Sequence, residues 1–184
     1  MKRLFFALEL EAEAKAGIRQ IQSSLKSQLK FDEVRFINPE NLHLTLYFLG
    51  DQSESKLEKF QSLVRNIAAE FNAFEISIAG RSNITANVLA MDILRGSREI
   101  IRIQSALAEK LLQDFGISDS RSFTPHLTIG RPRFRNRRIS PKTKALLEQF
   151  EIDTKINSIV LFESKLQPSG AVYSALEKCR LKSN

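Results

Sequence analysis

The sequence contains one cysteine, Cys179, and no long apolar run. A single cysteine excludes a disulfide within the chain and any CxxC metal or redox motif, so a reducing, cytoplasmic location is the simpler expectation. Glu9 interrupts the apolar run at the N-terminus, and no stretch approaches the roughly 20 apolar residues of a membrane span. We therefore expect a soluble protein with an inert cysteine and no membrane partner.

The chain is otherwise apolar and basic. Of its 184 residues, 42% are hydrophobic and 13 are phenylalanine, which is enough to fill one sizeable core. We expect a single domain over residues 1–184 and a monomer, although the sequence leaves the oligomeric state open. The formal net charge of +7 is compatible with a polyanionic partner or substrate without identifying one.

Short strands alternate with helices along the chain. Strands are predicted at residues 3–10, 33–37, 42–49, 74–80, 88–94, 126–131, 156–166 and 171–179. Apolar residues at helical spacing predict helices at residues 14–29, 55–71, about 98–115 and 141–150. A hairpin-length connection at residues 167–170 favours largely antiparallel sheets, and hence an α+β fold with helices on one face of each sheet.

The only two histidines, His43 and His126, head the same triplet, His-Leu-Thr, in "NLHLTLYFLG" and "TPHLTIGR". Nearly half the chain separates the two copies, which suggests two similar lobes that face each other. Side chains alternate along a strand, so each His shares a face with Thr45 or Thr128 over an apolar back. Two facing lobes would then line one cleft with two imidazoles and two hydroxyls.

A lone His-x-Thr in a strand is ordinary half-buried structure in most proteins, so either copy alone would say little. The repetition is informative. Given one His-Leu-Thr-aliphatic tetrapeptide, the chance that the only other His also heads one is on the order of one in a thousand at ordinary residue frequencies.

Two histidines on opposite sides of a cleft suit an in-line displacement at phosphorus. Such a reaction needs a base on the attacking oxygen, an acid on the leaving oxygen and donors for the remaining oxygens. A metal site is the alternative, but it needs a third ligand, and neither strand has an Asp or Glu two residues from its His. We therefore expect no metal and no cofactor.

Both motifs and their flanks resemble a known family. "VRFINPENLHLTLYFLG" and "RSFTPHLTIGR" are similar to the paired HxTx motifs of the two-histidine (2H) phosphoesterase superfamily, specifically the RNA 2′,3′-cyclic phosphodiesterases, also called LigT-like or 2′-5′ RNA ligases. The resemblance runs nearly end to end, from "KRLFFALEL" to "LFESKLQPSGAVYSAL". It implies a bilobal, pseudo-twofold fold with two mostly antiparallel sheets facing a central cleft.

The resemblance also implies an activity. It implies hydrolysis of a 2′,3′-cyclic phosphate end of RNA, or of a nucleotide, to a 2′-phosphomonoester without metal. By motif position, His43 would be the proton donor and His126 the proton acceptor, with Thr45 and Thr128 holding phosphate oxygens. The same site run in reverse is a 2′-5′ RNA ligase. A protein that keeps the cleft without turnover would be a nucleotide-binding or RNA-binding module.

The sequence departs from the family pattern at three places. Phe36 stands where Trp is usual, Tyr47 where a basic residue is frequent, and Ile-Gly at residues 129–130 where Leu-Ala or a similar pair is common. The first two departures bear on base stacking or RNA affinity. None of the three removes the catalytic atoms.

Two further residues are candidates for substrate binding. Arg131 matches a family arginine, yet strict alternation from His126 sends it to the back of the strand unless Gly130 allows a bulge that re-aims it. Tyr47 is in phase with His43 on its strand and could stack on a nucleobase. Packing at the rim of the cleft is the simpler expectation for Tyr47.

The densest basic run is "RPRFRNRRISPK", residues 131–142, which contains one Phe and no acid. Because it follows the second motif directly, we expect it to attract the RNA backbone, with an affinity that falls with salt and reads no sequence. The alternative is a solvated loop that leads into the helix started by Pro141.

Overall fold

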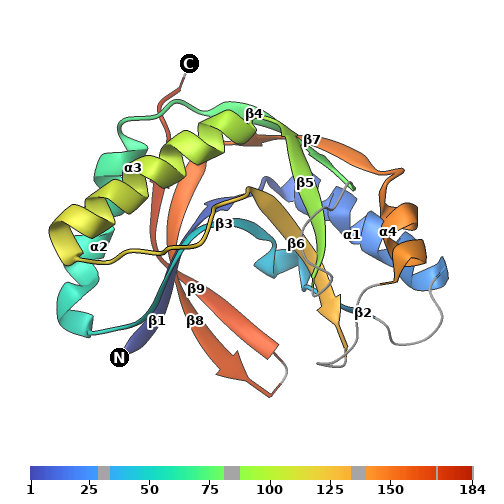
Figure 1. Cartoon of the computed structure of the whole chain (residues 1–184), viewed down its shortest axis with the longest axis horizontal. Coiled ribbons are helices and arrows are strands. Elements are labelled where there is room, and N and C mark those ends of the chain that lie inside the picture. Colours follow the sequence, from blue (N-terminus) through green and yellow to red (C-terminus); the bar gives the residue numbers. More distant parts are fainter. Residues whose placement is uncertain (29–33, 81–87, 134–139, 169, 184) are drawn as a thin grey trace.

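The computed structural model describes residues 1–28, 34–80, 88–133, 140–168 and 170–183, and contains two sheets with helices outside them (Figure 1). The first sheet has the strand order β3-β1-β8-β9 and the second has the order β2-β6-β5-β4-β7. All pairings between these strands are antiparallel. The strands are β1 (Lys2–Glu9), β2 (Val34–Phe36), β3 (His43–Gln52), β4 (Phe74–Ala79), β5 (Leu89–Arg95), β6 (His126–Pro132), β7 (Glu151–Ile156), β8 (Ser158–Gln167) and β9 (Gly170–Arg180).

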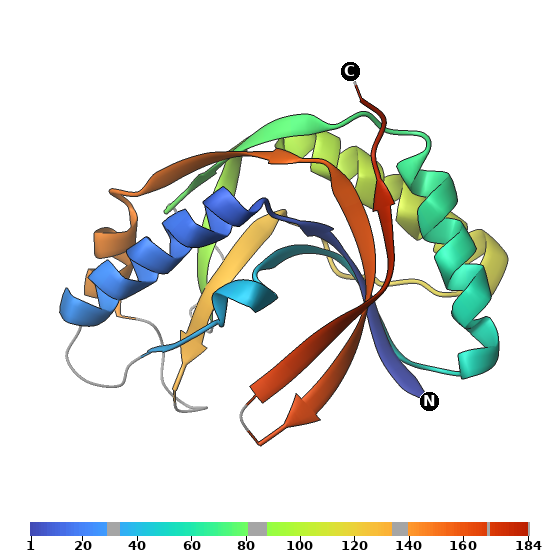
Figure 2. The same cartoon turned by 180° about the vertical axis from the view of Figure 1, so that it is seen from behind.

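The α-helices of the described chain lie on the outer sides of the two sheets (Figures 1 and 2). They are α1 (Ala12–Gln28), α2 (Leu57–Ala68), α3 (Ser97–Phe115) and α4 (Pro141–Leu147), with short 3₁₀ turns η1 (Pro39–Asn41) and η2 (Glu54–Lys56). Helix α2 contacts β8 and β9 of the first sheet, whereas α1 contacts β7 of the second. Because α1 directly follows β1 of the first sheet, the chain interleaves the two lobes.

Apolar periodicity explains how the helices pack. In α2 the buried side chains recur every three or four residues and form one face, made by Phe60, Leu63, Val64, Ile67 and Ala68. This face joins one continuous apolar cluster that includes residues of both sheets. The core therefore ties the two lobes together behind the cleft.

Strand β1 is buried on both faces, from Leu4 to Leu8. Leu4, Phe6 and Leu8 belong to the apolar cluster. The ring of Phe5 lies on the opposite face, where its centroid is 4.9 Å from that of the His43 ring. β1 thus contributes side chains to the core on one face and packs against His43 on the other.

The α+β class and the two facing antiparallel sheets are confirmed. The predicted strand at residues 156–166 is confirmed as β8 from Ser158 onward, but its first residue, Ile156, ends β7 of the second sheet, because the chain changes sheets at Asn157. β7 itself was not predicted. No α-helix of the described ranges is long and apolar enough to cross a bilayer.

Gly80 marks a close approach between β4 and the end of α4. Its N–H donates to the carbonyl oxygen of Phe150 at 3.1 Å, and a Cβ at Gly80 would lie 1.7 Å from the carbonyl oxygen of Leu147. We predict that Gly80→Ala destabilises the protein by about 1–3 kcal/mol or more, the usual cost of overpacking. Urea unfolding followed by circular dichroism measures this change.

Gly17→Ala in α1 is the matched control. A Cβ there meets only the end of the flexible Ile152 side chain, at 3.0 Å, and alanine is better than glycine inside a helix by about 1 kcal/mol. We expect this variant to be near neutral. A Gly80→Ala midpoint equal to that of the parent protein would contradict the close approach at α4.

Candidate active site

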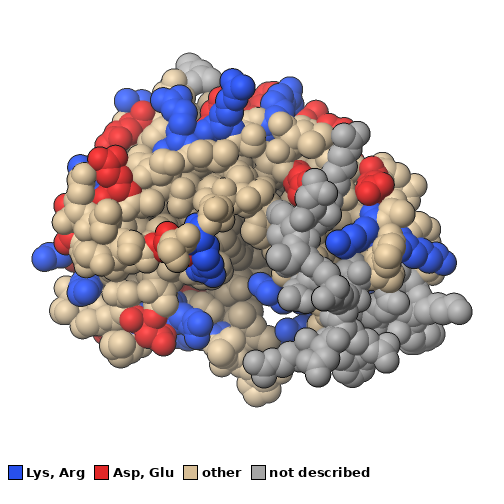
Figure 3. Space-filling model, in the orientation of Figure 1, with Lys and Arg blue, Asp and Glu red and all other residues tan. Residues whose placement is uncertain are grey.

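The two His-Leu-Thr strands lie next to each other. β3 and β6 come from different sheets, yet they are in contact and run side by side in both views (Figures 1 and 2). His43, Thr45, His126 and Thr128 all line one pocket. The face in Figure 3 is hollowed near its middle, with Lys and Arg side chains beside the hollow. The structure therefore brings together the four residues that the repeated triplet singled out.

Strand alternation orients these side chains as expected over the first four positions of each motif. Leu44 and Leu46 of β3 are buried, while His43 and Thr45 are half-buried and line the pocket. The same pattern holds in β6, where the buried residues are Leu127 and Ile129. The apolar back of each strand belongs to the core, which anchors the face that carries the His and Thr side chains.

Each imidazole is held by a backbone carbonyl two residues before it. Nδ1 of His43 lies 2.7 Å from the oxygen of Asn41, and Nδ1 of His126 lies 2.8 Å from the oxygen of Thr124. A carbonyl can only accept, so Nδ1 carries the proton in both rings. Nε2 of each ring is then the nitrogen that can exchange a proton with a substrate.

The two rings differ in their surroundings. His43 packs between Phe5, at 4.9 Å, and the edge of Tyr173, at 5.3 Å between ring centroids. Burial lowers the pKa of His43 to about 4; the hydrogen bond to Asn41 opposes this shift, and the charge of Lys15 adds to it. His43 is therefore neutral at pH 7 in the free protein, and its Nε2 lies 3.0 Å from the Thr45 hydroxyl.

A β-bulge interrupts each motif at the same place. In β3 the partners of Phe6 and Ala7 are Tyr47 and Thr45, so Leu46 is the extra residue. In β6 the partners of Leu89 and Ala90 are Gly130 and Thr128, so Ile129 is the extra residue. After the bulge the faces exchange, and the fifth residue beyond each His turns towards the pocket. These residues are Phe48 and Arg131, which both line it.

The two bulges determine where the side chains of Arg131 and Tyr47 point. The sequence left the direction of Arg131 open, and the bulge next to Gly130 turns its side chain to the pocket. The expected phase of Tyr47 is wrong: its side chain is 6% exposed and packs in the core, whereas that of Phe48 is 57% exposed. Strict alternation fails after Leu46, so the aromatic residue on the pocket face is Phe48. Apolar residues occur on both faces of the strand at residues 42–49, so the sequence pattern did not show this change.

Sequence reasoning also missed Tyr173 and Asn41 at the pocket. Tyr173 of β9 lines it beside His43. Asn41 lines it as well, and its side-chain amide donates to the carbonyl oxygen of Ala171 in β9 at 2.9 Å. The contact joins the loop before His43 to the β8–β9 hairpin. Both residues depend on how distant strands meet, so no local pattern marked them.

Basic side chains gather at the β2–β6 edge. Arg35 of β2 pairs in register with Arg131 of β6, and both residues are exposed. Of the basic run at residues 131–142, residues 134–139 lie outside the described residues, so the expected RNA contact of that run stays a prediction. Among the described residues, no group of three or more His, Cys, Asp or Glu is placed to hold a metal ion.

Known proteins share this sequence and fold. A family model described as the 2′-5′ RNA ligase superfamily matches residues 9–167. The chain is 33% identical to the RNA 2′,3′-cyclic phosphodiesterase of Methanothermobacter thermautotrophicus, an alignment that covers 97% of this chain and 98% of that protein. It is 27% identical to the protein of the same name from Methanocaldococcus jannaschii, with 96% and 99% covered.

Solved structures have the same fold. The crystal structure of E. coli LigT complexed with 3′-AMP matches with a TM-score of 0.79 at 23% identity and covers 98% of both chains. A protein of Thermus thermophilus matches with the same TM-score and identity and covers 99% of both chains. The family model spans most of the sequence, and the paired motifs meet in one pocket. The chain therefore belongs to the 2′-5′ RNA ligase superfamily of two-histidine phosphoesterases.

Proposed function

We propose that this protein is an RNA 2′,3′-cyclic phosphodiesterase, which hydrolyses a 2′,3′-cyclic phosphate end to a 2′-phosphomonoester. The observation that carries the proposal is the single pocket lined by both His–Thr pairs. The names of the M. thermautotrophicus and M. jannaschii relatives support it, as does the 3′-AMP complex of E. coli LigT, which is a nucleotide complex on the same fold.

In the proposed reaction, water attacks phosphorus in line with the bond to the 3′-oxygen. One histidine takes a proton from the water, and the other gives a proton to the departing 3′-oxygen, so the phosphate stays on the 2′-oxygen. The hydroxyls of Thr45 and Thr128 donate to the other phosphate oxygens, where negative charge develops. Arg131 adds positive charge at the same pocket.

The resemblance assigns the acid to His43 and the base to His126. The low pKa of His43 in the free protein means that an acid role requires the substrate to charge it. One negative charge at about 4 Å is worth about 4 kcal/mol at an effective dielectric constant of about 20. That energy corresponds to about 3 pKa units at 1.36 kcal/mol per unit, so a bound phosphodiester is sufficient to bring this pKa from about 4 to about 7.

A 2′-5′ RNA ligase would use the same pocket in reverse. An RNA 5′-hydroxyl would replace water as the attacking group, and microscopic reversibility gives the acid and base the same positions. The match to a superfamily named for this activity favours testing it. Adding a 5′-hydroxyl oligonucleotide to the hydrolysis assay reveals any 2′-5′ joined product.

The first prediction concerns the product. Chelator-treated protein should convert an oligonucleotide ending in a 2′,3′-cyclic phosphate to the 2′-phosphate, because the acid, the base and the oxyanion donors are all side chains. Chromatography against 2′- and 3′-phosphate standards measures the product. A 3′-phosphate product would refute the proposed direction of ring opening. If EDTA abolishes turnover and zinc or magnesium restores it, the alternative of a metal site would be supported. Tight binding without turnover would indicate a binding module.

The charge of His43 can be measured directly. Imidazole NMR should show that His43 titrates near pH 4 in the free protein, because burial disfavours its charged form. Saturation with a nucleoside 2′-monophosphate should raise this pKa by up to about 3 units. The His126→Gln variant assigns the two sets of resonances. A midpoint near 6.5 in the free protein would show that the ring is not desolvated.

The acid and base assignment needs a chemical test, because the same bell-shaped pH profile arises whichever histidine is the acid. Each His→Ala change should reduce kcat/KM by about 10² to 10⁴. An analogue whose leaving group is a nitrophenolate departs without a proton. With it, His43→Ala should recover much of its rate, while His126→Ala should stay inactive. The reverse pattern would exchange the two roles, and rescue of neither variant would assign both rings to phosphate binding.

A further inference from the structure

The outer end of the β8–β9 hairpin extends beyond its sheet at the catalytic pocket. The pairing of β1 with β8 ends at Glu163, whereas β8 and β9 pair as far as Gln167 and Gly170. Residues 164–167 and 170–173, which we call the hairpin end, therefore pair only with each other in the described sheets, and they project in both views (Figures 1 and 2). A two-stranded hairpin is marginally stable by itself in water, so contacts outside the strand pairing must hold this end.

Aromatic packing provides the first of these contacts. The ring centroid of Tyr173 in β9 lies 5.3 Å from that of His43 and 5.0 Å from that of Phe5, and both contacts are edge-on. The packing does not reach the tip of the hairpin, where Leu166 is 77% exposed. Tyr173 therefore joins the hairpin end to the ring of His43.

Asn41 provides a second, directional contact. Its side-chain amide donates to the carbonyl oxygen of Ala171 in β9 at 2.9 Å. Its backbone is fixed by the turn η1, in which its N–H donates to the carbonyl oxygen of Asn38 at 2.8 Å. Its own carbonyl oxygen accepts from Nδ1 of His43 at 2.7 Å. One residue thus connects the hairpin end to the backbone group that fixes the first imidazole.

The hairpin end also distinguishes the two histidines. His126 has a matching carbonyl contact, but its partner, Thr124, is exposed. His43 packs between the rings of Phe5 and Tyr173, and the second of these rings belongs to the hairpin end. A contact that fixes the hairpin end therefore also fixes the surroundings of His43.

We propose that Asn41 is a positioning residue for the reaction: its amide holds the hairpin end across His43, so that Tyr173 and the Asn41 carbonyl keep the imidazole oriented with Nε2 towards the substrate. The proposal rests on the proposed function, because that reaction passes a proton through His43. Asn41 acts through His43 and not on the reacting atoms. Loss of its side chain should therefore lower kcat and leave KM nearly unchanged.

Two variants remove the hydrogen bond between Asn41 and Ala171 in different ways. Asn41→Leu keeps the approximate size of the side chain and cannot donate. Asn41→Asp keeps the shape, but an ionised carboxylate only accepts and repels the carbonyl oxygen of Ala171. Each change should speed amide hydrogen exchange in the hairpin end and lower kcat by about three- to tenfold, the scale of one hydrogen bond in an equilibrium constant. If Asn41→Leu does not fold, Asn41→Asp still tests exchange and kcat.

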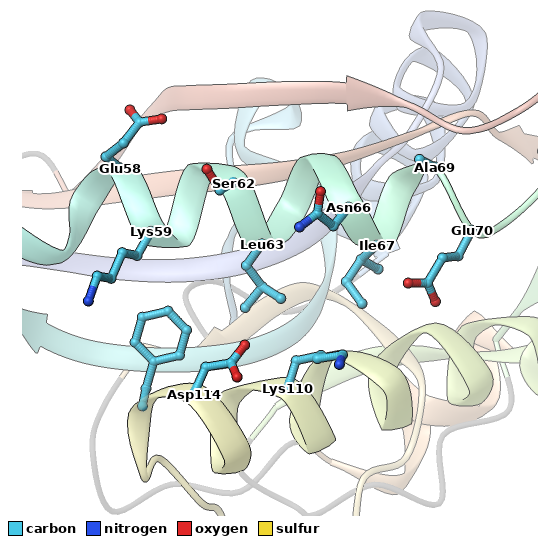
Figure 4. A pocket seen from close by; sticks show the side chains of 11 residues that line it. Glu58, Lys59, Ser62, Leu63, Asn66, Ile67, Ala69, Glu70, Lys110 and Asp114 are labelled. Atoms are coloured by element: carbon cyan, nitrogen blue, oxygen red, sulfur yellow. The ribbon is translucent and has the colours of Figure 1, made fainter.

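Gln61→Met is the matched control. The Gln61 amide of α2 also donates to a backbone carbonyl of β9, that of Leu176, at 3.1 Å. Figure 4 shows another side of α2, where Lys59 and Leu63 face Asp114 of α3 across a pocket of about 710 Å³. Gln61 lines neither this pocket nor the catalytic one. Its replacement should leave kcat and the exchange of the hairpin end unchanged.

A double-mutant cycle tests whether Asn41 acts through His43. On a His43→Ala background, Asn41→Leu or Asn41→Asp should cost no further activity, because the group that Asn41 positions is absent. This expectation holds whichever histidine is the acid. An equal loss in both backgrounds, or a rise in KM without a fall in kcat, would overturn the proposal and assign Asn41 to direct substrate binding.

The charge of His43 gives a measurement that requires no turnover. Without the hydrogen bond from Asn41, the hairpin end should open and admit water to the ring, which favours its charged form. Burial is the largest cause of the low pKa of His43, so its relief outweighs any weakening of the hydrogen bond to the Asn41 carbonyl. Asn41→Leu changes none of the ionisable groups around the ring, which are Lys15 of α1, Glu9 of β1, Tyr173 of β9, and His126 and Arg131 of β6.

Imidazole NMR of the free protein should therefore show the pKa of His43 rising from about 4 towards 6.5 in Asn41→Leu and staying near 4 in Gln61→Met. A pKa that stays near 4 in folded Asn41→Leu would refute the role of Asn41. Failure of the proposed function would look different, because a parent protein that hydrolyses no cyclic phosphate can still show this rise. In that case the titration and the hydrogen exchange decide whether Asn41 holds the hairpin end across His43.

Discussion

The pocket depends on a bulge at the same position in two strands. A regular strand would place Leu46 and Phe48 on one face, and Ile129 and Arg131 likewise. The extra residue in each strand instead leaves two consecutive residues buried, Leu46–Tyr47 and Ile129–Gly130, and returns the next side chain to the cleft. Without the bulges, Arg131 would point into the apolar back of β6, where an unpaired charge is costly.

The repeated bulge also divides the cleft into two kinds of surface. On β3 it presents the aromatic ring of Phe48, and on β6 it presents the cation of Arg131. Gly130 permits close packing at the second bulge, because a Cβ there would lie 2.5 Å from a methyl carbon of Val34 in β2. The corresponding position of β3 holds Tyr47, whose ring fills the core. The same backbone irregularity in two strands thus gives the pocket an apolar side and a charged side.

The sequence predicted what depends on local pattern. The amphipathic helices and the two His-Leu-Thr strands followed from periodicity, and the facing lobes followed from the repetition of the triplet. Features that depend on tertiary pairing were missed. The break at Asn157 falls one residue into the predicted strand, and the pairing of the segments on its two sides with different sheets separates β7 from β8. Tyr173 reaches His43 through the β8–β9 hairpin, whose place beside β3 no local spacing encodes.

Arg131 and Tyr47 show where pattern reasoning stops. In a regular strand Arg131 would face the core, which is unfavourable for a charged residue. The sequence therefore implied an irregularity near Gly130, and the bulge in β6 could be inferred. The bulge in β3 replaces one apolar residue by another on the pocket face, so the hydropathy pattern does not reveal it. The sequence thus revealed a backbone irregularity only where a buried charge would otherwise result.

The symmetry of the motif does not extend to its chemistry. Both rings donate Nδ1–H to a carbonyl two residues earlier, but the aromatic packing of His43 keeps it neutral. With Nδ1 protonated, Nε2 of neutral His43 accepts a hydrogen bond from the Thr45 hydroxyl. Once Nε2 is protonated, it donates to Thr45, and the hydroxyl proton of Thr45 becomes available to a phosphate oxygen. In the proposed reaction, a bound anion that charges His43 would therefore also release the Thr45 donor, which would couple binding and activation through one hydrogen bond.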